Sequence, residues 1–246
     1  MAVKKTTLPD GLRVVTERLN SVRSIAIGVW VDVGSRNERP EECGASHLIE
    51  HMHFKGTSTR SAHVLADAIE QYGGALNAFT TREQTCYYAR ILDEHLPQAM
   101  DVLSDMLMHS TFTPTNLKRE KSVVLEEIKE TEDTPSELVH DIFAGEFWGD
   151  HPLGRPILGT VDIVSGMRRK TLLDYIKRHY TAPKVVISAS GNLRHEELVA
   201  LVKEKFAFST AESPPLAPAV PPTNRRLHFV ERDIAQNHFV AAVSPA

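Results

Sequence analysis

The order of apolar patterns along this 246-residue chain constrains its fold more than any other feature. Apolar, β-branched runs typical of strands occupy residues 12–17, 24–33, 75–92 (long enough for a pair) and 184–191. Patterns typical of helices occupy residues 45–54, 62–72, 94–108, 116–129, 138–147, 171–179 and 194–206. These segments lack the regular strand–helix–strand alternation of a doubly wound sheet. The sequence therefore predicts an α+β fold, a two-layer sandwich of helices over a largely antiparallel sheet.

The composition changes near residue 208. Residues 209–224 contain five prolines in sixteen positions, a composition typical of an extended linker. Beyond this linker, residues 227–243 repeat the layout of residues 12–33: a short strand pattern ending in Glu-Arg, a polar turn and a longer apolar run. A match this short also arises by chance. We therefore divide the chain into three parts: a domain at 1–208, a Pro-rich linker at 209–224 and the start of a second, truncated homologous domain at 225–246.

Bulk composition excludes several classes of partner. A net charge of −4 gives no basic excess for nucleic acid. No apolar run approaches the roughly 20 residues needed for membrane insertion, and the first residues contain no apolar signal core. Two cysteines, Cys43 and Cys86, are too few for a disulfide framework, so we expect free thiols. These features favour a cytoplasmic location, or the mitochondrial matrix for a processed eukaryotic form.

The segment His47-Leu-Ile-Glu50-His51 is the strongest candidate for chemistry. Residues four apart share one face of a helix, so the two imidazoles can hold one zinc ion. The Glu50 carboxylate can then reach a water molecule on that metal. Two surface histidines on a charged helix are the alternative. His53 points to another side of such a helix, and we expect it at the surface.

A catalytic zinc ion needs a third protein ligand and an open position. The long helical pattern offers five glutamates between residues 120 and 132. At about 100° per residue, Glu120 and Glu127 fall on the apolar side of the helix with Val124, whereas Glu126 faces water. An inward carboxylate needs a metal or another partner. Because Lys121 also falls on this side, a buried ion pair is the alternative interpretation.

Four motifs, in order, resemble those of one family. The segment Gly44–Thr57 resembles the active-site helix of the pitrilysin/insulinase family, and most of all the branch with mitochondrial processing peptidase. The resemblance implies that Glu127, at the family's spacing from the histidine pair, is the third ligand and that Glu120 assists the site. Residues 73–85 resemble the family's substrate-binding edge strand, and residues 153–159 resemble a characteristic loop.

The resemblance implies a zinc-dependent endopeptidase that cleaves extended peptides or presequence-like segments. Zinc lowers the pKa of a bound water from about 16 toward 7, and Glu50 is expected to accept its proton as general base. The strand at Asn77, Ala78 and Phe79 would hold the peptide by edge pairing. The residues alone would favour an ordinary core strand, and only the resemblance indicates peptide binding.

Full members of this branch have two similar halves that enclose the substrate, and this chain resembles the amino-terminal half only. We therefore expect it to form a homodimer or to pair with a second family chain, and its activity alone is open. A non-catalytic subunit that acts in assembly is the alternative function, and a zinc hydrolase of non-peptide substrates is a more distant one. The complete set of His47, Glu50, His51 and Glu127 favours the enzyme.

Overall fold

The computed structural model describes residues 2–216, 218–219, 227–232 and 236–242. Its strands form one six-stranded sheet with the order β1-β2-β6-β3-β5-β4. They are β1 Val3–Thr7, β2 Arg13–Arg18, β3 Ser24–Val31, β4 Ala75–Thr80, β5 Thr85–Leu92 and β6 Val185–Gly191. All neighbours pair antiparallel except β2 and β6, which are parallel. The predicted α+β fold with a largely antiparallel sheet is confirmed.

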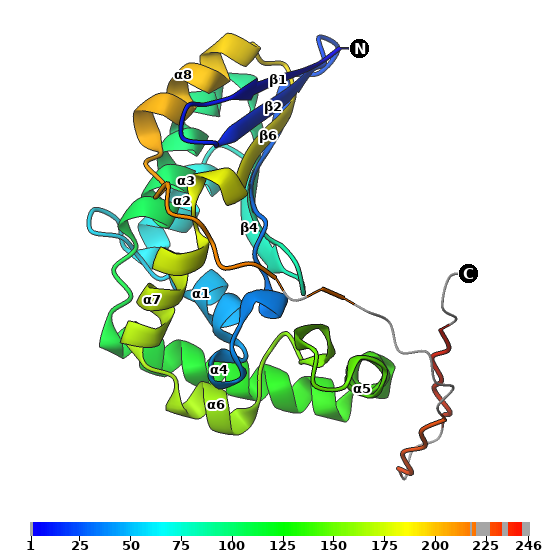
Figure 1. Cartoon of the computed structure of the whole chain (residues 1–246). Helices are drawn as coiled ribbons and strands as arrows, with labels where there is room; N and C mark the ends of the chain where they lie inside the picture. Colours follow the sequence, from blue (N-terminus) through cyan, green and yellow to red (C-terminus); the bar gives the residue numbers. More distant parts are fainter. Residues whose placement is uncertain (1, 217, 220–226, 233–235, 243–246) are drawn as a thin grey trace.

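Helices cover one face of this sheet (Figure 1). They are α1 Ala45–His53, α2 Ala62–Glu70, α3 Leu96–His109, α4 Pro114–Asp133, α5 Pro135–Trp148, α6 Val161–Gly166, α7 Arg169–His179 and α8 His195–Lys205. Along β3 the side chains alternate, with Ile25, Ile27 and Val29 at most 2% exposed on the helix side. The core therefore lies between the helices and a single face of the sheet.

α1 occupies the position that matters most for the site. It contacts both the edge strand β4 and the long helix α4, and α4 in turn contacts α5 and α6. In Figure 1, α4, α5 and α6 form a group at the end of the molecule away from β1. α1 thus brings its side chains to the junction between the sheet edge and this helical group.

Three details differ from the expectations. The strand β1 was not predicted, because its Val-Lys-Lys-Thr-Thr sequence is polar and mostly exposed, as suits an edge strand. α6 was missed because it spans only six residues. The helices expected at 116–129 and 138–147 are both longer than their patterns: α4 ends at Asp133, and α5 begins at Pro135, a position where no backbone N–H is needed.

The last part of the chain leaves the predicted second domain untested. Residues 227–232 and 236–242 contain neither helix nor strand, whereas residues 217, 220–226, 233–235 and 243–246 of the predicted linker and second domain lie outside the described residues. The boundaries at 208 and 224 therefore stay predictions. Cys43 and Cys86 are buried free thiols, as expected. Within the described residues, no helix combines the length and apolar character that crossing a membrane requires.

Candidate metal centre and active site

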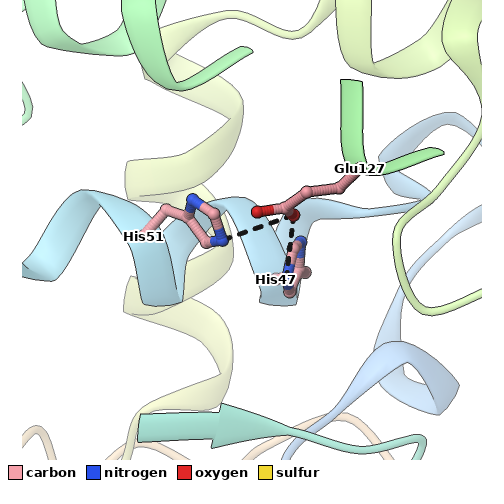
Figure 2. Close-up of side chains that lie close together, drawn as sticks. All are labelled: His47, His51 and Glu127. Atoms are coloured by element: carbon pink, nitrogen blue, oxygen red, sulfur yellow. Dashed lines mark ion pairs between the residues drawn. The ribbon is translucent and has the colours of Figure 1, made fainter. Parts of the chain in front are cut away.

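Two histidines of α1 and one glutamate of α4 converge, as Figure 2 shows. The His47 and His51 rings lie with their centroids 4.5 Å apart. The Oε2 atom of Glu127 is 3.7 Å from Nε2 of His47 and 3.6 Å from Nε2 of His51. One candidate ligand atom from each residue lies within 4.8 Å of the others. The three side chains are thus close enough to bind a single cation.

The chemistry of this donor set fits zinc. Two imidazole nitrogens and one carboxylate oxygen are a common ligand set for catalytic zinc and leave a fourth position open. Burial, together with the neighbouring His51 ring, lowers the pKa of His47 to about 4. His47 is therefore neutral at neutral pH, and only a neutral imidazole offers a lone pair to a metal.

Glu120 lies behind His51 and is almost fully buried. Its Oε2 atom is 3.3 Å from Nδ1 of His51 and 3.1 Å from Nζ of Lys55. A carboxylate at this position fixes the orientation of the imidazole and leaves its other nitrogen facing Glu127. The alternative partner Lys121 donates instead to the carbonyl of Met167, at 3.2 Å. Glu120 thus contacts both His51 and Lys55, and the Lys55 side chain is partly exposed.

Glu50 lies beside the candidate metal ligands and is held by the sheet. Its carboxylate accepts a hydrogen bond from the Thr80 hydroxyl at the end of β4. Burial raises the pKa of Glu50, while the Thr80 hydrogen bond opposes that rise. A carboxylate with a raised pKa accepts a proton more readily than an exposed one, as a general base requires.

A cavity of about 500 Å³ opens beside His47 and Glu50. It is lined by His47, Glu50, Ala78, Phe79, Thr80, Thr131, Glu137, His140, Asp141, Ile157 and Leu158. The polar residues of α5 in this lining, Glu137, His140 and Asp141, were not singled out in the sequence. Nothing local in the sequence marks them, because only the packing of α5 beside α4 brings them here.

The predicted substrate-binding strand is β4, which lies at one edge of the sheet. Ala78 and Phe79 line the cavity, whereas Asn77 does not. Asn77 instead accepts a hydrogen bond through Oδ1 from the Ala78 N–H, at 2.8 Å. Edge strands can add a further extended chain, so the position of β4 is compatible with peptide binding.

The start of α1 is anchored by a buried glutamate that the sequence reasoning missed. Glu38 is 3% exposed and accepts hydrogen bonds from the N–H groups of Gly44, at 2.9 Å, and Ser46, at 2.8 Å. Gly44 has φ +93°, and a Cβ there would lie 2.6 Å from the Leu158 carbonyl oxygen. These contacts fix the first turn of the helix directly before His47.

The expectation for His53 was wrong. Its side chain is 1% exposed, and Nδ1 lies 2.9 Å from the Met106 carbonyl oxygen. Its ring meets Tyr87 and Phe112 edge-on. The face of α1 that carries His53 packs against α3 and the sheet rather than facing solvent. This histidine is therefore a core residue. Glu126, by contrast, faces water as predicted, with 72% of its side chain exposed.

Fold and site together define a two-layer α+β protein with a candidate three-residue metal centre. Residues 13–161 match the family model described as Insulinase (Peptidase family M16), and residues 166–244 match the model described as Peptidase M16 inactive domain. The chain belongs to the insulinase family, peptidase family M16. The resemblance inferred from the motifs is confirmed.

Curated relatives support the same assignment. An uncharacterized zinc protease of Bacillus subtilis is 50% identical over 78% of this chain and 47% of its own length. A probable mitochondrial-processing peptidase subunit beta of Arabidopsis thaliana is 47% identical over 82% of this chain and 38% of its own. A Mycobacterium leprae zinc protease is 44% identical over 98% of this chain and 55% of its own. The chain thus spans about half the length of the curated relatives it matches.

Solved structures share the fold. A protease from Helicobacter pylori superposes with a TM-score of 0.82 at 22% identity, covering 90% of this chain and 54% of that one. At this identity the likeness concerns the fold alone. The same layers and sheet are therefore built from largely different side chains.

Proposed function

We propose that this chain is a zinc-dependent endopeptidase domain that hydrolyses bonds in extended peptides. The observation that carries the proposal is the convergence of His47, His51 and Glu127. His47 and Glu50 line a cavity that includes residues of the edge strand β4. The names of the curated relatives, zinc protease and processing peptidase, support the same class.

The residues of the site have distinct roles in this proposal. Zinc held by His47, His51 and Glu127 would supply a Lewis acid and lower the pKa of a water molecule. Glu50 would accept a proton from a water molecule as general base and deliver it to the leaving amine. Glu120 keeps the His51 ring oriented through Nδ1, and Thr80 orients the Glu50 carboxylate.

The substrate would lie along β4 as an added strand. In that arrangement alternate side chains of the peptide face the cavity, beside Ala78 and Thr80. Two carboxylates of α5 line this cavity. Asp141 is paired with Arg82 at 2.9 Å, whereas Glu137 carries a further negative charge. Such a lining favours a basic substrate side chain, which supports presequence-like peptides as substrates.

Metal analysis and a quenched-peptide assay test the proposal. We expect one zinc per chain, and we expect Glu50→Gln to retain zinc but lose cleavage. Glu127→Gln should lose zinc, whereas its exposed neighbour changed by Glu126→Gln should behave as wild type. Equal cleavage by wild type and Glu50→Gln would refute the mechanism.

The partner of this domain is also a proposal. Because the chain spans about half of its relatives, we propose that it works with a second family domain, supplied by a second copy or another family chain. Light scattering across a concentration series tests self-association, and a strict monomer would rule out the homodimer. Binding of a partner chain without any cleavage of peptides would indicate a non-catalytic role in assembly. The cytoplasmic location stays a prediction.

A further inference from the structure

The candidate metal centre uses only part of the contact between α1 and α4. Asn116, Glu120 and Glu127 lie four and seven residues apart, so they share one face of α4. Glu120 and Glu127 contact the histidine pair of α1. Asn116, in the first turn of α4, instead donates from Nδ2 to the Lys55 carbonyl, at 2.7 Å. One stripe of α4 thus contacts α1, and the turn that follows it, at three successive levels.

Lys55 meets this stripe twice. It lies two residues after the end of α1, in a tight turn in which its N–H donates to the Met52 carbonyl at 3.1 Å. Its own carbonyl accepts from Asn116, and its Nζ atom lies 3.1 Å from Oε2 of Glu120. A single residue therefore joins the helix that carries both histidines to two levels of the helix that carries Glu127.

The ammonium of Lys55 and the ring of His51 share one oxygen atom of Glu120. Oε2 of Glu120 lies 3.3 Å from Nδ1 of His51 and 3.1 Å from Nζ of Lys55. Glu120 is 6% exposed, and a buried carboxylate needs its partners in place. Without the ammonium, this carboxylate would gain by turning toward water, and Nδ1 of His51 would lose its acceptor.

The second histidine offers no substitute for this contact. Nδ1 of His47 is buried and has no hydrogen-bond partner among the described residues. Hydrogen bonding therefore orients the ligand pair through His51 and Glu120. Because an imidazole ligand is fixed by the acceptor on its other nitrogen, whatever holds Glu120 in place also holds one of the candidate metal ligands.

We propose that Lys55 is a positioning residue of the metal centre. Its ammonium keeps Glu120 against His51, and its carbonyl, held by Asn116, sets the end of α1 against the first turn of α4. The proposal rests on the proposed zinc-dependent function and assigns a role to a residue outside the ligand set. Lys55 acts on the metal through the geometry of His51 rather than through its own charge.

The sign of the effect separates positioning from charge. A fixed ammonium near a metal site repels a divalent cation, so a lysine without a positioning role would weaken zinc binding and its removal would strengthen it. A lysine that positions Glu120 has the opposite effect, because the hydrogen-bond partners of a ligand contribute about 10–100-fold to metal affinity. Removal of the Lys55 ammonium should therefore weaken zinc binding.

The zinc affinity of the full chain, measured by competition with a chromophoric chelator, tests the proposal without any peptide. Lys55→Met should bind zinc about tenfold more weakly than wild type, and Lys55→Arg, which keeps a cationic donor, should recover most of the loss. Asn116→Ala changes no charge and should also weaken zinc binding. Lys121→Met is the matched control and should bind zinc like wild type. Lys121 follows Glu120 on α4 but donates to the Met167 carbonyl, at 3.2 Å.

A double-mutant comparison shows whether Lys55 acts through Glu120. Lys55→Met keeps the carbonyl that Asn116 holds, so it removes the ammonium alone. In a Glu120→Gln background it should therefore change zinc affinity by no more than about twofold. Cobalt(II) in place of zinc gives a spectroscopic readout, because its visible absorption depends on coordination geometry. The cobalt spectrum should change in Lys55→Met and stay that of wild type in Lys121→Met.

The outcomes distinguish this role from the metal centre itself. Unchanged or tighter zinc binding by Lys55→Met, or a full tenfold loss in the Glu120→Gln background, would overturn the role of Lys55 and leave the metal centre standing. A wild type that binds no zinc would instead refute the metal centre, and the role of Lys55 with it. Because 35% of the Lys55 side chain is exposed, methionine leaves no buried cavity. If Lys55→Met nevertheless fails to fold, wild-type zinc affinity in Asn116→Ala would overturn the proposal.

Discussion

Replacing Glu38 should weaken the whole chain because this buried carboxyl group anchors α1. Glu38→Ala leaves the N–H groups of Gly44 and Ser46 buried without their acceptor. Each unsatisfied buried group costs about 1–3 kcal/mol, so the loss is about 4 kcal/mol. That is a large share of the roughly 5–15 kcal/mol by which domains are stable. In a chain of this size it corresponds to a fall in Tm of about 10 °C.

The same change should reach the metal site. His47 follows Ser46 directly, so a loosened first turn moves one ligand while leaving its chemistry intact. We therefore expect added zinc to raise the Tm of wild type more than that of Glu38→Ala. Scanning fluorimetry with and without zinc measures both effects. Glu41→Ala, a change at an exposed neighbour, is the control.

The pH dependence gives a stricter test. Burial raises the pKa of Glu38 to about 8, so the folded chain holds this proton more tightly than the unfolded chain does. The contribution of this proton to the free energy of unfolding is fully present below about pH 4.5 and is lost as the pH rises through 8. Glu38→Gln cannot ionise, so its Tm should not contain this loss. The Tm of wild type minus the Tm of Glu38→Gln should therefore fall from pH 6 to about 9. A rise in this Tm difference with pH would refute the reasoning, and so would a Glu38→Ala protein with the Tm of wild type.

Three further predictions follow from the site and the core. Thr80→Val should lower kcat while zinc content stays constant, and Thr80→Ser should restore it; equal rates for both variants would argue against an orienting hydroxyl. Glu137→Gln should reduce kcat/KM for peptides with arginine near the cleaved bond more than for neutral peptides, and a uniform loss would contradict the charge argument. Burial lowers the pKa of His179 to about 4, so its contribution to stability, roughly 3 kcal/mol, is lost as pH falls from about 6.5 toward 4. His179→Phe should flatten the Tm-against-pH curve between about pH 6.5 and 4. An unchanged curve would exclude a contribution of His179 to the acid loss of stability.

Helical periodicity is the reason that the residues of the candidate metal centre could be singled out in the sequence. The pair His47 and His51 depends on one helical turn, and the inward direction of Glu127 and Glu120 depends on the apolar arc of one helix. Both are local properties. The convergence of the two helices is not local, and the sequence indicated it only through resemblance to a family.

The features that escaped prediction depend on distant parts of the chain. His53 was expected at the surface because its own helix says nothing about α3 packing over it. Glu38 and Thr80 look like ordinary polar residues until the fold brings them to α1. Glu137 and Asp141 reach the cavity because α5, which begins at Pro135, packs beside α4. No spacing rule within one segment could have identified these contacts.

The single parallel pairing of the sheet has a consequence for how the protein is made. β6 lies between β2 and β3, yet it comes from residues 185–191, far later in the chain than either neighbour. A nascent chain that has not yet emerged to this strand has two sheet fragments separated by an empty central position. Long-range pairings of this kind close late and slowly. Both histidines therefore leave the ribosome well before the layer that supports them is complete.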